Sequence, residues 1–216
     1  MILIRPRFEI LNISADLTMI EQAGRTCYKS EAKITGVSAT EFVRSILKRG
    51  HESVIEHSSV TVRIVCDRGV THEIVRHRLA SYSQESTRYC NYKGGVTFVI
   101  PPWVNITAGE YNDDMAAGTM DSYMDRFWFD SMHHAESMYI GLINGGWTPQ
   151  QARSVLPNSL KTEIIMTANL REWRHFFNLR TSPAAHPQMR EIAIPMLSRF
   201  KRCVPVVFAD IHVKKA

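Results

Sequence analysis

The chain has 216 residues, of which 44% are hydrophobic and 22% charged, a balance typical of a globular protein with one substantial core. No stretch reaches the roughly 20 consecutive apolar residues that a membrane span needs, so the composition excludes an integral membrane protein and predicts no membrane partner. The net charge of +5 is compatible with an anionic partner, whether a nucleotide, a phosphorylated cofactor or a nucleic acid.

The N-terminal part of the chain is predicted to contain one strand and two helices. Residues 2–13 are expected to form the strand, and residues 17–28 the first helix. The second helix is expected to begin at Ser38, because Glu41 three residues later completes the pattern of a capping box. It is expected to end at Gly50, since glycine readily adopts the left-handed conformation that terminates helices.

The middle of the chain alternates between regular elements and polar segments. Val60, Val62 and Ile64 recur at every second position, which is typical of a strand. Gly145 is expected to end the one long helix. The expected elements are a strand over residues 60–66, a short helix over 70–79, a polar loop over 80–95, a short strand over 96–100, a polar connector over 105–119 and a long helix over 120–143.

The C-terminal part is predicted to be mostly helical. Thr148-Pro149 is expected to open a short helix and Asn169 to cap a longer one, because both are typical of helix N-termini. The other expected bounds are a strand over residues 162–167, a helix that extends to residue 179 and a last helix over 188–202.

The order of these elements indicates the fold class. Strands and helices mix without a regular βαβ alternation, so we expect an α+β fold with a mostly antiparallel sheet. Helices, including one long helix, are expected to pack against this sheet. No linker or repeat divides the chain, so a single domain over residues 1–216 is expected.

Several common site patterns are absent from the sequence. There is no GxGxxG, GxxxxGK[ST] or GxSxG. His72 and His77 lie five residues apart, which does not place them on one helical face, so no metal is expected. The four cysteines form no CxxC pair and the first residues lack a signal peptide, so free thiols and a cytoplasmic location are expected.

An arginine-rich segment over residues 76–89 is the most informative part of the sequence. It holds three arginines and a histidine together with serines and an amide, and it contains no lysine. Arginine offers a planar fork that matches phosphate or carboxylate, and hydroxyl groups with loop N–H groups complete such a pocket. From these residues alone, an anion or nucleotide site and a surface loop with fortuitous arginines both remain open.

The segment resembles the signature RHRx7S of flavin-dependent thymidylate synthases. Arg76-His77-Arg78 is followed after seven residues by Ser86, and the match extends through Tyr89. The resemblance covers roughly residues 20–100 and 148–200. Further matching segments are His51-Glu52, Glu56-His57, Ala152-Arg153-Ser154-Val155-Leu156-Pro157, Asn169-Leu170-Arg171, His175-Phe176 and Leu179-Arg180.

The resemblance implies an activity, cofactors and an assembly. Members transfer the methylene of 5,10-methylenetetrahydrofolate to C5 of dUMP, and the product is dTMP. Reduced FAD supplies the hydride, and NADPH reduces the flavin again. The resemblance also implies the fold of this family and a homotetramer with active sites at subunit interfaces. It further implies that no side chain of the enzyme attacks the substrate as a covalent nucleophile.

The resemblance further implies the roles of individual residues. His51 is expected to help place the folate. The residues expected to contact FAD are Ser53, Glu56, Arg76, His77, Arg78, Gln84, Asn169, Leu170, Arg171 and His175. The residues expected to bind dUMP are Glu73, Arg76, Gln84, Glu85, Ser86, Thr87, Arg88, Arg153 and Arg180.

Arg180 is the expected catalytic residue. A guanidinium beside the uracil favours the base with N3 deprotonated, because an opposite charge stabilises the ionised form. Ser86 is either a nucleophile or a substrate-binding group. A serine nucleophile needs a general base, and the sequence identifies none, so we expect Ser86 to bind substrate.

The helix that follows Asn169 supports a site independently of the resemblance. Leu170, Trp173 and Phe177 form its expected buried stripe, and Arg171, His175 and Asn178 form a polar line on the opposite side. These three polar residues are therefore expected to lie on one face of the helix.

Two other functional classes remain as alternatives. A basic nucleic-acid-binding module needs charges along a surface and aromatic residues that stack on bases, whereas these arginines cluster in two separated blocks. No nucleic-acid partner is therefore expected. A metal-dependent phosphate-ester hydrolase would use the histidine and glutamate residues.

Overall fold

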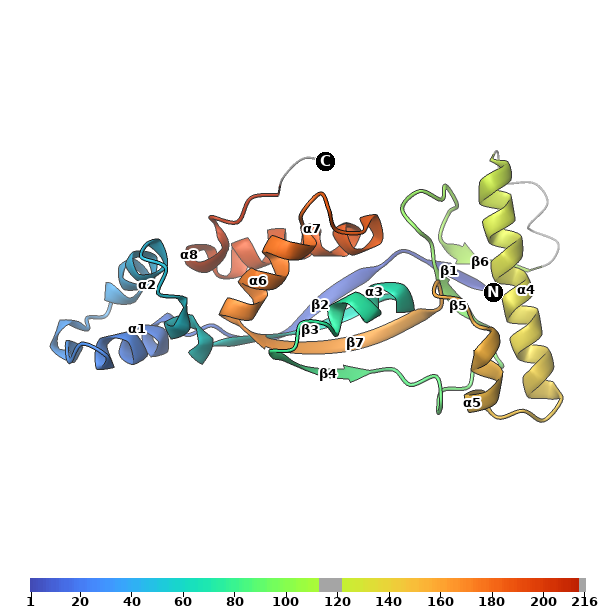
Figure 1. Ribbon diagram of the computed structural model, residues 1–216, viewed down its shortest axis with the longest axis horizontal. Coiled ribbons are helices and arrows are strands. Elements are labelled where there is room, and N and C mark those ends of the chain that lie inside the picture. The colour runs from blue at the N-terminus through green and yellow to red at the C-terminus, as the bar shows by residue number, and fades with distance from the viewer. Residues whose placement is uncertain (113–121, 214–216) are drawn as a thin grey trace. The chain divides into compact units, whose positions relative to one another are not determined.

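Two groups of residues, each packed mainly against itself, make up the computed structural model, which describes residues 1–112 and 122–213 (Figure 1). The first unit comprises Met1–Arg7, Ile64–Arg76 and Ser83–Ile164. The second unit comprises Phe8–Arg63, His77–Tyr82 and Ile165–Ala216. The expectation of a single domain stays a prediction.

The first unit joins a small sheet to a long helix. Its elements are β1 (Ile2–Ile4), α3 (Arg68–Ile74), β5 (Thr97–Val99), β6 (Gly109–Glu110), α4 (Tyr123–Asn144), α5 (Pro149–Ala152) and η4 (Arg153–Val155). Strand β1 is central in the order β5-β1-β6, parallel to β5 and antiparallel to β6. Leu3 pairs with Phe98, and both side chains are completely buried.

Helix α4 closes the core of the first unit. Phe129 and Tyr139 of α4 are buried in the same apolar cluster as Leu3 and Phe98. The Glu136 carboxylate accepts from the amide of Val96 over 2.8 Å and pairs with the N-terminal ammonium group over 2.9 Å. The long helix that the sequence predicts is confirmed, except that expected positions 120 and 121 lie outside the described residues.

The second unit is mainly helical around an aromatic core. Its elements are β2 (Arg7–Ser14), α1 (Leu17–Thr26), η1 (Glu31–Lys33), α2 (Ser38–Lys48), η2 (Glu52–His57), α6 (Leu170–Arg180), α7 (Pro187–Cys203) and α8 (Pro205–Phe208). Trp173 and Phe177 of α6 pack against Phe200 of α7, with ring centroids 5.0 and 4.9 Å apart. The Trp173 indole N–H donates to the Val60 carbonyl over 3.0 Å, so the buried ring has a polar partner.

Four strands contribute residues to both units. They are β2, β3 (Ser59–Asp67), β4 (Ala80–Gln84) and β7 (Lys161–Asn169), and they form a four-stranded sheet in the order β2-β3-β7-β4. The expected α+β architecture, with sheets and packed helices, is confirmed. The expected strands at 60–66 and 162–167 and the helix capped by Asn169 are also confirmed.

The predicted N-terminal strand over residues 2–13 is wrong in one respect, because it is two strands. It breaks between β1 and β2 at Arg5 and Pro6. Proline lacks the N–H that a central ladder position requires. The Arg5 guanidinium instead donates to the carbonyls of Pro101 and Val104, each over 3.1 Å.

The predicted capping box at Ser38 is also wrong. Helix α2 already includes Ser38, and its N-cap residue Val37 has no side-chain capping bond. The Ser38 hydroxyl accepts from the Thr35 amide over 2.8 Å and donates to Glu21 over 2.7 Å. These two bonds, one of them to the distant Glu21, replace the capping bond that the pattern predicts.

Two corrections concern the segment around the arginine-rich signature. The helix expected over residues 70–79 is α3, which ends at Ile74, and the expected loop begins with strand β4. The half-buried residues of β4 are Ala80, Tyr82 and Gln84. Two of these three carry polar groups, so the inward face lacks the apolar alternation that predicts a strand.

The remaining expectations concern the connector and membranes. Strand β6 lies within the connector expected over residues 105–119, whose residues from 113 onward lie outside the described part of the chain. Within residues 1–112 and 122–213, no helix combines the length and apolar character that crossing a membrane requires.

Candidate cofactor and substrate sites

A cavity of about 520 Å³ in the second unit gathers side chains from distant segments. This volume falls in the range of small-molecule sites, about 300–1,000 Å³. Its lining comes from η2, the segment after His77, and α6 with its N-cap residue. The lining residues are Glu52, Glu56, Leu79, Asn169, Arg171, Glu172, Arg174, His175 and Asn178.

Helix α6 orients the polar side of this cavity. The Asn169 side chain caps the helix by accepting from the Glu172 amide over 2.8 Å. Leu170, Trp173 and Phe177 are completely buried, which confirms the predicted stripe. Arg171, His175 and Asn178 all line the cavity, as their helical spacing predicts.

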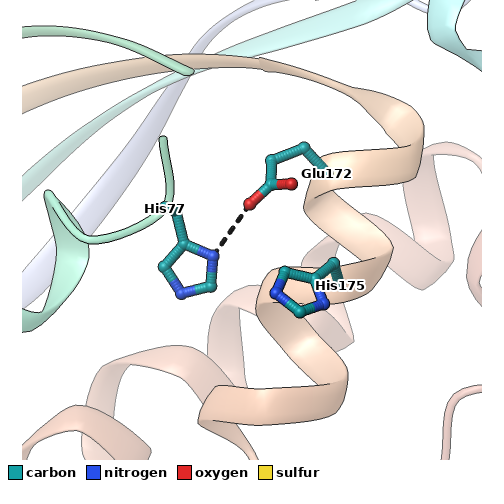
Figure 2. A group of neighbouring side chains, drawn as sticks. All are labelled: His77, Glu172 and His175. Carbon is teal, nitrogen blue, oxygen red and sulfur yellow. Dashed lines mark hydrogen bonds and ion pairs between the residues drawn. The ribbon is translucent and has the colours of Figure 1, made fainter. Parts of the chain in front are cut away.

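His77 lies against α6 and links the signature to this helix. Its Nδ1 atom lies 2.9 Å from Glu172 Oε1, and Arg180 Nε donates to its Nε2 atom over 3.0 Å. Figure 2 shows His77, Glu172 and His175 converging from these two segments. Residues 77 and 180, which are far apart in sequence, are therefore direct neighbours.

Burial affects the protonation of this cluster. The His77 side chain is buried, and this burial is the largest influence that lowers its pKa below the ordinary value. Burial also raises the pKa of Tyr82 to about 12. The Tyr82 hydroxyl donates to the His77 carbonyl over 2.7 Å. Both rings are therefore neutral near pH 7.

Ion pairs hold two arginines of the cavity. Arg171 pairs with Glu56 over 2.6 Å at an exposed position. Arg174 is buried, and its guanidinium binds Glu52 over 3.0 Å and both oxygens of Asp210 over 2.7 and 2.8 Å. Arg174 is thus a structural cation, whereas Arg171 lies where a ligand can reach it.

A second cavity, of about 440 Å³, lies in the first unit. Its basic groups are Arg68 and Arg153. Arg153 donates to the Thr87 hydroxyl over 3.1 Å, so two residues predicted to bind dUMP are in direct contact. The lining residues are Arg68, Thr87, Gln150, Arg153, Ser154, Leu156, Pro157, Asn158 and Leu160.

Other signature residues of the first unit also have hydrogen-bond partners. Arg88 donates to Gln150 over 3.0 Å. The Gln84 amide donates to the hydroxyls of Thr71 and Thr162 over 3.0 and 3.3 Å. The Glu85 carboxylate accepts from Tyr92 over 2.7 Å and from Lys161 over 3.0 Å. These bonds connect the segment to other residues of the first unit.

Ser86 has a local partner. Its hydroxyl accepts from the Arg88 amide over 3.3 Å, and its carbonyl accepts from the amides of Tyr89 and Cys90. A backbone amide cannot act as a general base. The prediction that Ser86 binds substrate rather than attacking it stays a prediction.

The remaining predicted residues differ in exposure. The side chains of His51, Ser53, Arg76 and Arg78 are exposed, and Glu73 is half-buried. Leu170 is completely buried and its amide donates to Ser58, so its side chain serves the core. Its predicted FAD contact stays a prediction.

The predicted residues divide between the two units according to their expected ligand. Of the FAD set, only Arg76 and Gln84 belong to the first unit; of the dUMP set, only Arg180 belongs to the second. The second-unit residues are Ser53, Glu56, His77, Arg78, Asn169, Leu170, Arg171, His175 and Arg180. The first-unit residues are Glu73, Arg76, Gln84, Glu85, Ser86, Thr87, Arg88 and Arg153.

Sequence reasoning missed several residues of these cavities. Glu172 has the sequence position of a helix-capping acid, but its carboxylate contacts His77. Its spacing of four from the buried Phe176 is a signal that it faces inward. Arg68 and Asn158 carry no comparable signal, because loop packing places them at the first-unit cavity.

Comparisons with known proteins identify the family of the chain. A family model described as thymidylate synthase complementing protein matches residues 9–206. A flavin-dependent thymidylate synthase of Geobacter sulfurreducens is 36% identical over 196 residues, covering 87% of this chain and 78% of the relative. The enzyme of the same name from Mycobacterium tuberculosis is 36% identical over 203 residues, covering 90% and 79%.

A solved structure is similar over nearly the whole chain. It is a UMP/dUMP methylase, PolB, from Streptomyces cacaoi bound with 5-Br dUMP, with a TM-score of 0.79 and 25% identity. The similarity covers 97% of this chain and 96% of that chain. With the family model and the relatives above, it leads to one conclusion: this chain belongs to the flavin-dependent thymidylate synthase family.

Proposed function

We propose that this chain converts dUMP to dTMP, with 5,10-methylenetetrahydrofolate as one-carbon donor and FAD reduced by NADPH. The observation that carries the proposal is the second-unit cavity, which brings Asn169 and residues Arg171 and His175 of α6 together with Glu56. All four are residues for which the resemblance to the family predicts FAD contact. The proposal follows the names of the relatives and the reaction of the methylase with the similar fold.

The chemistry of the cavity fits a flavin dinucleotide. Arg171 supplies a charged donor suited to a pyrophosphate, and the side chains of Asn169, His175 and Asn178 supply amide and imidazole groups. When bound, FAD supplies the hydride that completes the methyl group. The protein side chains bind and orient the ring system, and the buried stripe of α6 keeps them rigid.

The first-unit cavity suits the phosphate of a nucleotide. Arg153 and Thr87 present a guanidinium and a hydroxyl there, and Arg88 lies on the same segment as Thr87. Arginine binds phosphate through paired N–H donors. In this proposal Arg180 stands beside the uracil and stabilises the base with N3 deprotonated, which raises electron density at C5.

We also propose a homotetramer in the cytoplasm. Helix α4 exposes large apolar side chains, with Tyr123 76%, Met124 71% and Phe127 60% accessible. Such a row of apolar residues is typical of a protein–protein contact. A partner copy would cover it. The cysteines are all free thiols, as is usual in a reducing compartment.

A flavin spectrum tests the proposed function. The purified protein should be yellow or should bind added FAD, with a flavin absorption band that shifts when dUMP is added. Reduction by NADPH should bleach the band, and the complete mixture should form dTMP. A protein that binds DNA with a steep salt dependence but never binds flavin or dUMP would contradict the proposal.

Replacement of Ser86 tests its role. In Ser86→Ala we expect a weaker affinity for dUMP and a measurable rate of dTMP formation, because only a hydrogen bond worth about 0.5–1.5 kcal/mol is lost. The assay compares kcat and KM for dUMP with the unchanged protein. Complete loss of turnover with dUMP still bound would instead identify Ser86 as a nucleophile.

A further inference from the structure

Glu172, His77 and Arg180 form a continuous hydrogen-bonded chain within the second unit. Glu172 Oε1 lies 2.9 Å from His77 Nδ1, and Arg180 Nε lies 3.0 Å from His77 Nε2. Figure 2 shows the Glu172 carboxylate directed from α6 at the edge of the His77 ring. One buried histidine is thus held between an acidic and a basic side chain.

The contact with Arg180 determines the tautomer of His77. A guanidinium has only donors, so the Nε2 atom must accept with its lone pair. In a neutral imidazole the hydrogen is then on Nδ1, from which it is donated to Glu172. The ionised carboxylate stabilises this tautomer over the other, in which Nε2–H would face Arg180 Nε–H.

We propose that Glu172 is a positioning residue for Arg180 and acts through His77. The inference rests on the proposed function, which places Arg180 beside the uracil. Because the guanidinium is planar, a fixed Nε–H determines the plane of the whole group. Glu172 therefore holds Arg180 in the orientation in which it stabilises deprotonated uracil.

The surroundings hold Glu172 and His77 in place. Asn169 caps the amide of Glu172 over 2.8 Å, and the Glu172 side chain is buried. Tyr82 donates to the His77 carbonyl over 2.7 Å, and the Phe176 ring packs 4.9 Å from the His77 ring, measured between centroids. Because Glu172 and His77 are buried and fixed, the His77 ring presents its Nε2 atom to Arg180 in one orientation.

The contact requires a neutral His77. The titratable groups facing its ring are Glu172, His175 and Arg180 of α6, and Tyr82 of β4 binds its carbonyl. Burial is the largest influence and lowers the pKa of His77, and Glu172 partly opposes this effect. Protonation at low pH would add a hydrogen to Nε2 and break the contact with Arg180.

The same tautomer argues against a metal ion at this cluster. His77, Glu172 and His175 place possible ligand atoms within 4.8 Å of one another. A metal ligand must offer a lone pair. In His77 the hydrogen occupies Nδ1, and the lone pair on Nε2 is used by Arg180. The cluster is therefore better suited to hydrogen bonding than to metal binding.

The substitution Glu172→Gln tests the proposal in the FAD-loaded protein. It leaves the shape but removes the charge, and a rotated amide can donate to Nδ1 and favour the wrong tautomer. We expect kcat for dUMP methylation to fall about 5- to 100-fold, with KM for dUMP little changed. We also expect the acid limb of the kcat profile to move to lower pH, since loss of Glu172 lowers the pKa of His77 further.

A second measurement does not depend on catalysis. Nitrogen-15 NMR of histidine-labelled protein should show the His77 hydrogen on Nδ1, and a mixture of tautomers in Glu172→Gln. The control is Glu41→Gln, which removes an exposed carboxylate of α2 and should leave kcat and the pH profile unchanged. NMR of the unsubstituted protein decides the tautomer even where Glu172→Gln fails to fold.

Two results would overturn the proposal. One is a folded Glu172→Gln protein with unchanged kcat and an unchanged acid limb. The other is a hydrogen on Nε2 of His77 in the unsubstituted protein. If the unsubstituted protein forms no dTMP, the proposed function fails, but the NMR result still distinguishes this failure from a failure of the hydrogen-bonded chain.

Discussion

Arg180→Ala should abolish most dUMP methylation while FAD remains bound. We expect kcat to fall about 10²- to 10³-fold, the usual effect of removing one group that stabilises developing charge. The guanidinium lies at the end of α6, where His77 fixes its Nε atom. Alanine removes the charge that favours deprotonated uracil. The measurement is the rate of dTMP formation, alongside the flavin absorption spectrum.

The control for this prediction is an arginine far from the cavity. Arg44 is exposed on α2 and pairs with Glu41, so Arg44→Ala should leave kcat unchanged. Arg180→Lys keeps the charge without the planar fork and should recover only part of the rate. An Arg180→Ala protein with full activity would refute the activating role of this residue.

Trp173→Ala should cause the largest loss of stability. The indole is completely buried among Phe176, Phe177 and Phe200, and its N–H donates to the Val60 carbonyl. Removing such a ring costs about 3–5 kcal/mol through lost burial and the cavity that remains. For a chain of this size, the melting temperature should fall by about 6–20 °C. Calorimetry of the two proteins measures the change.

The matched control is another tryptophan. Trp147 is 47% exposed, so Trp147→Ala should change stability by no more than about 0.5 kcal/mol. The loss of stability in Trp173→Phe should lie between those of Trp147→Ala and Trp173→Ala. Phenylalanine keeps most of the apolar contact but leaves the Val60 carbonyl without its donor. Equal melting temperatures for Trp173→Ala and Trp147→Ala would contradict the assignment of the core.

Local sequence patterns were enough to predict several elements and one face of the site. Asn169 caps α6 as its residue type indicates, and Gly145 follows α4. The spacing of Arg171, His175 and Asn178 predicts their common face, because the helical period alone decides it. The signature over residues 76–89 is enough to predict the family, since its residues are matched in order over a long segment.

Tertiary contacts explain the elements for which the local sequence pattern gives the wrong prediction. Ser38 has the sequence of a capping residue, yet its hydroxyl binds Glu21, seventeen positions away. Strand β4 carries polar residues because it is an outer strand of its sheet, where few apolar side chains are required. A pattern in the spacing of nearby residues cannot predict contacts with residues that are distant in the sequence.

The chemistry of the site shows the same division. The residue types for phosphate, flavin and uracil binding can be read from the sequence, because guanidinium, imidazole and amide groups are properties of the residues. The contacts of His77 with Glu172 and with Arg180, 95 and 103 positions away along the chain, arise from folding. Burial of that histidine, and hence its neutral state, depends on packing between segments that the sequence separates.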